Sequence, residues 1–102
     1  MVFVLQGTGT LRVGAEKYPL RPGDVVALPP GGKETAHEIV NTGDDELRYL
    51  AVSTKQSPEV GEYPDSGKFG VFAEAPPDAD GNPRFLRFVS REELSLNYWD
   101  GE

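Results

Sequence analysis

The sequence contains no cysteine and only one histidine, His37, among its 102 residues. The absence of cysteine excludes disulfide bonds, thiolate metal sites and cysteine nucleophiles. Because the chain has a single histidine, any histidine-dependent metal site or Ser-His-Asp triad within it must include His37. The chemistry open to the chain is therefore narrow, and the sequence leaves open whether the protein is an enzyme.

Positive charge and long apolar runs are also scarce. Ten Lys and Arg residues stand against 17 Asp and Glu residues, a formal net charge of -7. A surface of this sign does not suit phosphate neutralisation, so we expect no nucleic-acid partner. The longest apolar runs are about five residues, far short of a membrane span, and no basic, apolar signal segment precedes the first expected strand. We therefore expect a globular, cytoplasmic protein with no membrane partner.

The first half of the chain consists of short β-type segments separated by turn signals. Residues 1–6 are β-branched and aromatic, residues 10–13 alternate between polar and apolar, and residues 17–20, 25–28 and 36–40 predict further short strands. We interpret residues 7–9, Gly-Thr-Gly, as a hairpin turn, and Asn41 as the first residue of a further turn. Residues 46–53 are apolar on both faces, which predicts a central strand. No helical period is present before Ser57, so we predict an all-β sandwich or small barrel.

The second half of the chain has a different composition. Residues 57–67 are rich in Pro, Gly, Ser and acids, and residues 73–83 predict an exposed loop. Residues 69–72 and 84–89 predict one or two additional strands, and the Ser90 to Glu93 pattern is a capping box that predicts a short helix. We therefore expect a β-barrel core over residues 1–57 and a loop-rich extension over residues 58–102 that packs on it.

One stretch of the core resembles a known family motif. Gly23 is followed by Pro29 and Gly31, then by His37 and, four residues later, by Asn41. This order is similar to the second motif of the cupin superfamily, of the cupin-2 conserved barrel type. Five residues separate Gly31 from His37, where the family usually has two.

The resemblance covers roughly residues 1–54 and implies a jelly-roll, or double-stranded β-helix, sandwich. Residues 1–6 followed by Gly7 are similar to the end of the first cupin motif, which carries two His and one Glu. The resemblance thus implies a barrel shortened at its N-terminus, with the first motif upstream of Met1. Three of the four metal ligands of the family are then outside this sequence.

Two residues are candidates for the site that the resemblance implies. Strand alternation places His37, Ile39 and Asn41 on one face, which is the inner face in a cupin barrel, so His37 is the candidate metal ligand. A divalent metal such as Zn, Mn, Fe or Ni would require ligands from elsewhere, and neither Glu34 nor Glu38 replaces them. Without such ligands, His37 is interpreted as an interior or rim histidine.

Tyr49 is the candidate ligand-binding residue. It alternates with Leu47 and Ala51, so its hydroxyl would reach a small molecule in the mouth of the barrel. Aromatic packing is the alternative role. Asn41 is interpreted as a turn residue rather than as a binding residue.

Three hypotheses of function remain open from the sequence. In the first, the cupin domain binds a small polar ligand in the barrel with an incomplete metal site. In the second, the protein is a metal-dependent enzyme, similar to sugar or sugar-phosphate isomerases, whose first motif precedes Met1. In the third, residues 1–6 form an unprotected apolar strand, which predicts a homodimer by strand addition or swapping.

Overall fold

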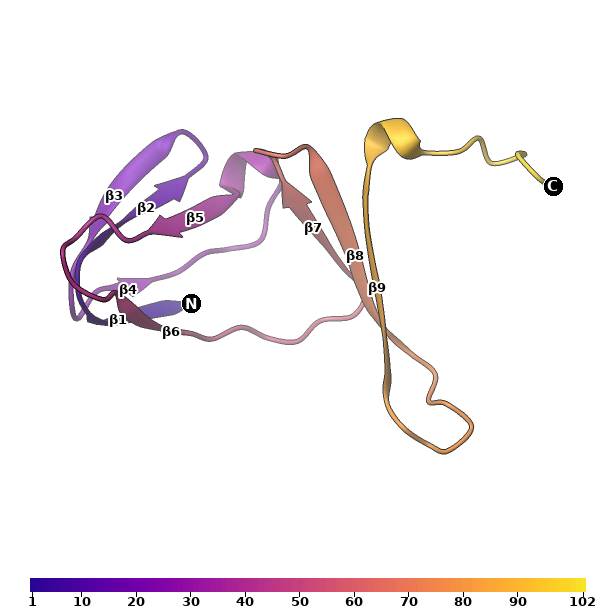
Figure 1. Cartoon of the computed structure of the whole chain (residues 1–102), viewed down its shortest axis with the longest axis horizontal. Coiled ribbons are helices and arrows are strands. Elements are labelled where there is room, and N and C mark those ends of the chain that lie inside the picture. Colours follow the sequence, from indigo (N-terminus) through magenta and orange to yellow (C-terminus); the bar gives the residue numbers. More distant parts are fainter. The chain divides into compact units, whose positions relative to one another are not determined.

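The computed structural model describes all residues from 1 to 102, and nearly all of its regular structure is β-strand. The chain divides into two compact units, Met1–Thr54 and Lys55–Glu102 (Figure 1). No helix in it has the length and apolar character needed to span a membrane. The all-β fold class predicted from the sequence is confirmed.

The first unit is built from six strands in two three-stranded antiparallel sheets. One sheet has the order β4-β1-β6 and the other has the order β3-β2-β5. The strands are β1 (Val2–Gln6), β2 (Gly9–Val13), β3 (Glu16–Leu20), β4 (Val25–Val26), β5 (His37–Val40) and β6 (Arg48–Ala51). A single 3-10 turn, η1 (Lys33–Thr35), precedes β5. The arrangement is consistent with a cupin-type sandwich.

The segment between β1 and β2 connects the two sheets, so the hairpin predicted at residues 7–9 is wrong. β1 pairs with β4 and β6, whereas β2 pairs with β3 and β5. Gly7 adopts a φ of 81°, and a Cβ there would collide with the carbonyl group of Glu46. A turn signal of this kind marks a reversal of the backbone but does not say which strand the chain pairs with next.

The strand order also corrects two predictions about strand position. β1 is the central strand of its sheet, so residues 1–6 are not unprotected, and the strand-exchange argument for a homodimer loses its basis. β6, predicted as central, is an edge strand. Its outward residue Leu50 lies opposite Phe3, which in turn lies opposite Val25. This apolar row on the outer face explains why both faces of β6 are apolar.

The core of the first unit lies between its two sheets. Its buried hydrophobic residues are Val2, Val4, Leu11 and Leu20, each 5% exposed or less. Burying an aliphatic side chain of this size stabilises the folded state by about 1.5–3 kcal/mol. Five half-buried residues pack around this core: Val13, Val26, Leu28, Ile39 and Leu47.

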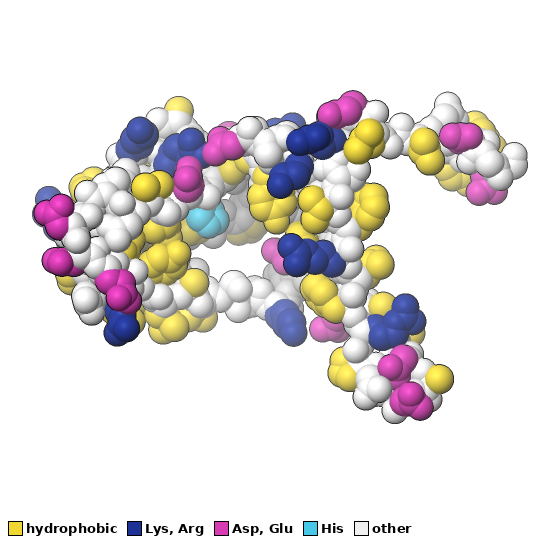
Figure 2. All heavy atoms as spheres, in the orientation of Figure 1, with side chains coloured by type: hydrophobic (Ala, Val, Ile, Leu, Met, Phe, Trp, Pro, Cys, Tyr) yellow, Lys and Arg dark blue, Asp and Glu magenta, His cyan; other side chains and the backbone are white.

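The second unit is a three-stranded antiparallel sheet, β7-β8-β9, formed by Glu59–Tyr63, Lys68–Ala75 and Arg84–Arg91. The two strands predicted from the sequence are present and longer than expected. The third, β7, was missed because Gly61 and two glutamates, Glu59 and Glu62, are residue types that strands disfavour. Hydrophobic and charged side chains both reach the surface of this sheet (Figure 2).

The helix predicted after β9 is a single 3-10 turn, η2 (Glu92–Leu94). Arg91, not Ser90, occupies the N-cap position, and no side chain caps the turn. The Ser90 hydroxyl donates to the carbonyl oxygen of Arg91 instead. The capping-box prediction is therefore wrong, because β9 extends through both residues.

Candidate functional site

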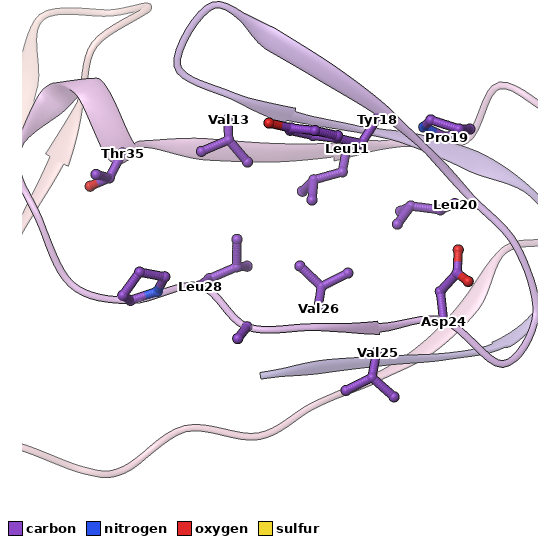
Figure 3. A pocket seen from close by; sticks show the side chains of 12 residues that line it. Leu11, Val13, Tyr18, Pro19, Leu20, Asp24, Val25, Val26, Leu28 and Thr35 are labelled. Atoms are coloured by element: carbon purple, nitrogen blue, oxygen red, sulfur yellow. The ribbon is translucent and has the colours of Figure 1, made fainter.

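A pocket of about 490 Å³ lies between the two sheets of the first unit (Figure 3). It is bounded by β2 and β3 on one side and by β4 with its following segment on the other. Twelve residues line it: Leu11, Val13, Tyr18, Pro19, Leu20, Asp24, Val25, Val26, Ala27, Leu28, Pro29 and Thr35. Nine of these twelve are aliphatic or proline residues, so the pocket has an apolar body with three polar side chains.

Strand pairing explains why several of these side chains point into one space. Leu11 lies opposite Tyr18 in the β2–β3 ladder, and residues directly opposite each other share a face of the sheet. Val26 lies opposite the buried Val2 and therefore points inward from the other sheet. Figure 3 shows Leu11 and Val26 facing each other across the gap. The alternation of the sequence thus produces an apolar interior.

The turn between β3 and β4 places Asp24 at the pocket. Its carboxylate Oδ2 accepts a hydrogen bond from the backbone N–H of Arg21 at 2.8 Å. Val4 of the central strand holds this turn from both sides: its N–H donates to the Asp24 carbonyl oxygen, and its carbonyl oxygen accepts the N–H of Gly23. The predicted turn is confirmed, whereas the position of Asp24 in the pocket lining was missed, because a Pro-Gly-Asp turn has the same sequence wherever its side chain points.

Tyr18 and Thr35 are the other two polar side chains of the lining. The Tyr18 hydroxyl donates a hydrogen bond to the carboxylate of Glu16. This hydrogen bond and the negative charge of Glu16 raise the pKa of Tyr18 above its ordinary value of 10.0. The Thr35 hydroxyl donates to the carbonyl oxygen of Gly32 at 2.9 Å, within the loop that carries η1.

His37 is the first residue of β5 and lies opposite Val13, while Ile39 lies opposite Leu11. Since Val13 and Leu11 line the pocket, the β5 register places His37 on the inner face. The imidazole is nevertheless exposed and is not part of the pocket lining.

The residues of this chain do not form a metal site around His37. The structure contains no group of three or more His, Cys, Asp or Glu side chains arranged to hold a metal ion. Glu38 faces the opposite side of the sheet, where its carboxylate forms an ion pair of 2.8 Å with Arg12. Glu34 accepts the N–H of Gly32. The role of His37 as a metal ligand stays a prediction that requires ligands from outside these residues.

Tyr49 lies opposite the buried Val4 in the β1–β6 ladder, so it shares the inner face of its sheet. It is 43% exposed and does not line the pocket. Its predicted role in ligand binding therefore stays a prediction, and the pocket directs attention to Tyr18 instead. Sequence alternation could not distinguish the two tyrosines, because both occupy inward positions.

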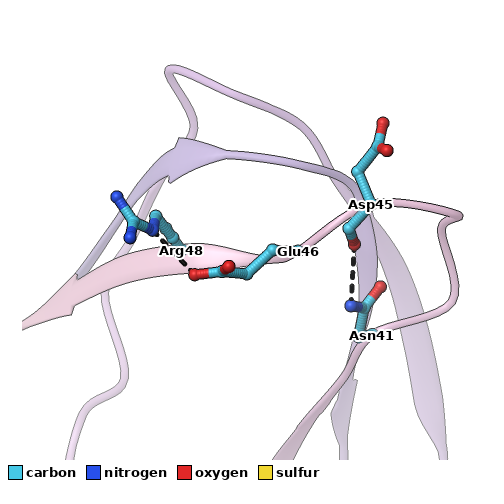
Figure 4. A network of polar contacts seen from close by, with 4 residues as sticks. All are labelled: Asn41, Asp45, Glu46 and Arg48. Carbon is cyan, nitrogen blue, oxygen red and sulfur yellow. Dashed lines mark hydrogen bonds and ion pairs between the residues drawn. The ribbon is translucent and has the colours of Figure 1, made fainter.

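Asn41 forms the turn that its sequence context predicts (Figure 4). Its Oδ1 accepts the N–H of Gly43 at 3.1 Å, and its Nδ2 donates to the carbonyl oxygen of Asp45 at 2.9 Å. Next to this turn, the Arg48 guanidinium and the Glu46 carboxylate pair at 2.8 Å across two residues of the chain. The Asn41 side chain is thus occupied by backbone groups of its own turn, and the interpretation as a turn residue is confirmed.

The family comparison agrees with this architecture. No similar curated protein and no similar solved structure was found. A family model described as a cupin domain matches residues 1–53, which is almost the whole of the first structural unit. The chain belongs to the cupin family.

Proposed function

We propose that this cupin domain binds a small organic molecule in the pocket between its two sheets. The observation that supports the proposal is the pocket itself: its volume of about 490 Å³ falls within the size range of small-molecule sites. Such sites combine an apolar lining with a few polar groups that orient the ligand. Tyr18, Asp24 and Thr35 supply those groups here.

The lining favours a ligand with an apolar body. The sequence suggested a small polar ligand, but nine of the twelve lining residues have no polar side-chain atom. A ligand that is polar on all sides would leave water-bonding groups without partners against this surface, which is costly. A compact hydrocarbon or aromatic body with one polar group matches the lining better.

A metal-dependent enzyme is the second candidate, supported by the inward position of His37 in β5. Such an enzyme would need further metal ligands from outside this sequence, because a metal site takes about four ligands, or three and a water. A sugar-phosphate substrate also fits the pocket poorly, since no Lys or Arg lines it. We therefore place small-molecule binding first.

The proposal is tested with 2-phenylethanol as a probe and two matched Leu-to-Trp variants. Leu28→Trp fills the pocket from the inside, whereas Leu50→Trp adds the same indole to the outer face of β6. We expect the probe to shift the methyl resonances of Leu11, Val13 and Leu20 in the wild type and in Leu50→Trp, but not in Leu28→Trp. Melting curves of both variants establish that they are folded.

Two results would contradict the proposal. One is binding of the probe to Leu28→Trp with unchanged affinity, which would place the probe elsewhere on the chain. The other is the absence of saturable shifts at these methyl groups for the probe and for a series of aromatic and cycloalkyl analogues.

A further inference from the structure

We infer that the pocket selects a cationic, hydrogen-bond-donating ligand: a small organic amine with an apolar body. This inference rests on the proposed function and specifies the ligand class of the same site. It comes from the polar groups of the lining, which offer acceptors and a negative charge to a ligand but few donors.

The hydroxyl protons of Tyr18 and Thr35 are already donated in hydrogen bonds within the chain. Each hydroxyl has one proton to donate and lone pairs that accept. The Tyr18 proton goes to the Glu16 carboxylate, and the Thr35 proton goes to the Gly32 carbonyl oxygen. Toward a ligand, both oxygens therefore act as acceptors. Pro19 and Pro29, which also line the pocket, have no backbone N–H to donate.

Asp24 contributes the only formal charge of the lining. An ionised carboxylate only accepts hydrogen bonds, and its partner here is the uncharged backbone N–H of Arg21. Figure 3 shows the carboxylate directed from the turn toward the space beside Leu20. No Lys or Arg lines the pocket, and Arg12 is paired with Glu38 on the outer face of its sheet. The negative charge of Asp24 is thus not neutralised within the pocket.

These features predict that the affinity of the pocket depends on the charge of the ligand. An ammonium group has three donors and a positive charge, so it can form a charge-assisted hydrogen bond with the anionic acceptor, Asp24, which lies at the opposite end of the pocket from Thr35 in Figure 3. An alcohol of the same shape matches the acceptors but gains nothing from the charge. A carboxylate or a phosphate finds neither a cation nor a hydroxyl proton, and it is repelled by Asp24.

The experiment compares three probes with the same aromatic body: phenethylamine, 2-phenylethanol and phenylacetate. Dissociation constants are measured near neutral pH by titrating the methyl resonances of Leu11, Val13 and Leu20. We expect the amine to bind about tenfold more tightly than the alcohol, the scale of a charge-assisted hydrogen bond, and the carboxylate to bind most weakly.

Two single-charge variants locate the origin of the preference. Asp24→Asn keeps an oxygen for the Arg21 N–H but removes the charge, so the affinity for the amine should fall to that for the alcohol. Asp44→Asn, in the exposed turn after β5, removes the same net charge far from the lining and should leave all three affinities unchanged. The alcohol reports whether the pocket is intact in each variant.

The outcomes separate this inference from the proposed function. Equal binding of all three probes, or tighter binding of the carboxylate, would overturn the amine inference and leave the pocket as a binding site. An amine preference that survives in Asp24→Asn would also overturn it. If no probe binds at these methyl groups, both proposals fail.

Discussion

His37 lies directly opposite Val13 in the β2–β5 ladder, at the exposed end of the face that Leu11 and Ile39 share. Its imidazole therefore belongs to the interior side of the sandwich but is not part of any group of three or more His, Cys, Asp or Glu side chains that could hold a metal ion. His37 thus occupies a position similar to that of a metal ligand in the family, but a complete set of metal ligands is not formed around it. The consequence can be measured on the chain itself.

A single imidazole should bind zinc weakly. We expect Zn²⁺ to shift the His37 ring resonances of this 102-residue chain only at concentrations that also shift free imidazole, since structural and catalytic zinc sites need three or four protein ligands. The melting temperature should not rise with added zinc, because a metal raises stability only in proportion to its affinity for the folded state. The measurement is a zinc titration followed by NMR and by thermal melting.

His37→Ala is the matched control for that titration. The variant should lose the ring shifts and keep the melting temperature of the wild type, because the exposed imidazole has no hydrogen-bond partner whose loss would destabilise the fold. Saturable zinc binding that raises the melting temperature of the wild type and disappears in His37→Ala would show that this chain supplies a complete site, contrary to the prediction.

The hydrogen bond from Tyr18 to Glu16 predicts a pH dependence at the rim of the pocket. The bond and the Glu16 charge favour the neutral phenol and raise its pKa in the folded state. The stabilisation is therefore fully present below the unfolded pKa of about 10 and is lost as the pH rises through the higher folded value. Tyrosine ring-carbon NMR should show Tyr18 titrating at higher pH than the ordinary value.

Glu16→Gln separates the cause of that shift from simple burial. It removes the charge but keeps an acceptor, so the pKa of Tyr18 should move down toward its ordinary value. A Tyr18 pKa that is unchanged in Glu16→Gln would mean that the bond does not form in solution.

The sequence predicted local features of the fold better than it predicted strand neighbours. Asn41 encodes its own turn, because its side chain bonds backbone groups two and four residues away. The crossing at Gly7 was misread as a hairpin because the choice between β2 and β4 as the partner of β1 depends on contacts far away in the chain. Pairing is a property of the assembled core rather than of a single turn.

In the candidate site, too, the sequence predicted local features but not contacts between distant segments. The inward position of His37 followed from strand alternation, which is a local property. The pocket was not predictable, because Tyr18, Asp24 and Thr35 come from three separate segments that the two sheets bring together. The hydroxyl protons of Tyr18 and Thr35 are donated to neighbouring atoms of the chain, which limits what the pocket can bind. No sequence pattern specifies these hydrogen bonds.

Gly14 connects the β2–β3 hairpin to the loop that carries Thr35, and it provides a test of that connection. Its φ of 56° suits the first position of a two-residue hairpin turn. Its N–H donates to the carbonyl oxygen of Ala36 at 2.9 Å, and a Cβ at this position would lie 2.5 Å from the carbonyl oxygen of Glu34. An added methyl group must therefore displace the backbone of η1.

Gly23→Ala is the matched comparison for Gly14→Ala. Gly23 also has a positive φ, of 90°, but a Cβ there would meet nothing within 4 Å. The backbone strain of Ala at positive φ should lower the free energy of unfolding by about 1–2 kcal/mol in both variants. Gly14→Ala should lose roughly a further 1 kcal/mol, because the clash with Glu34 is added to the strain. Urea denaturation with a shared m-value measures the difference.

Ligand binding extends this comparison to function. The displacement of η1 in Gly14→Ala moves Thr35, so 2-phenylethanol should bind more weakly to that variant than to Gly23→Ala, each measured where the variant is fully folded. Equal losses of stability and equal affinities in the two variants would show that the η1 loop moves away from the added methyl group without a measurable loss of free energy of unfolding. In that case Thr35 would not be held against the pocket through Gly14, and the acceptor at this side of the lining would be mobile.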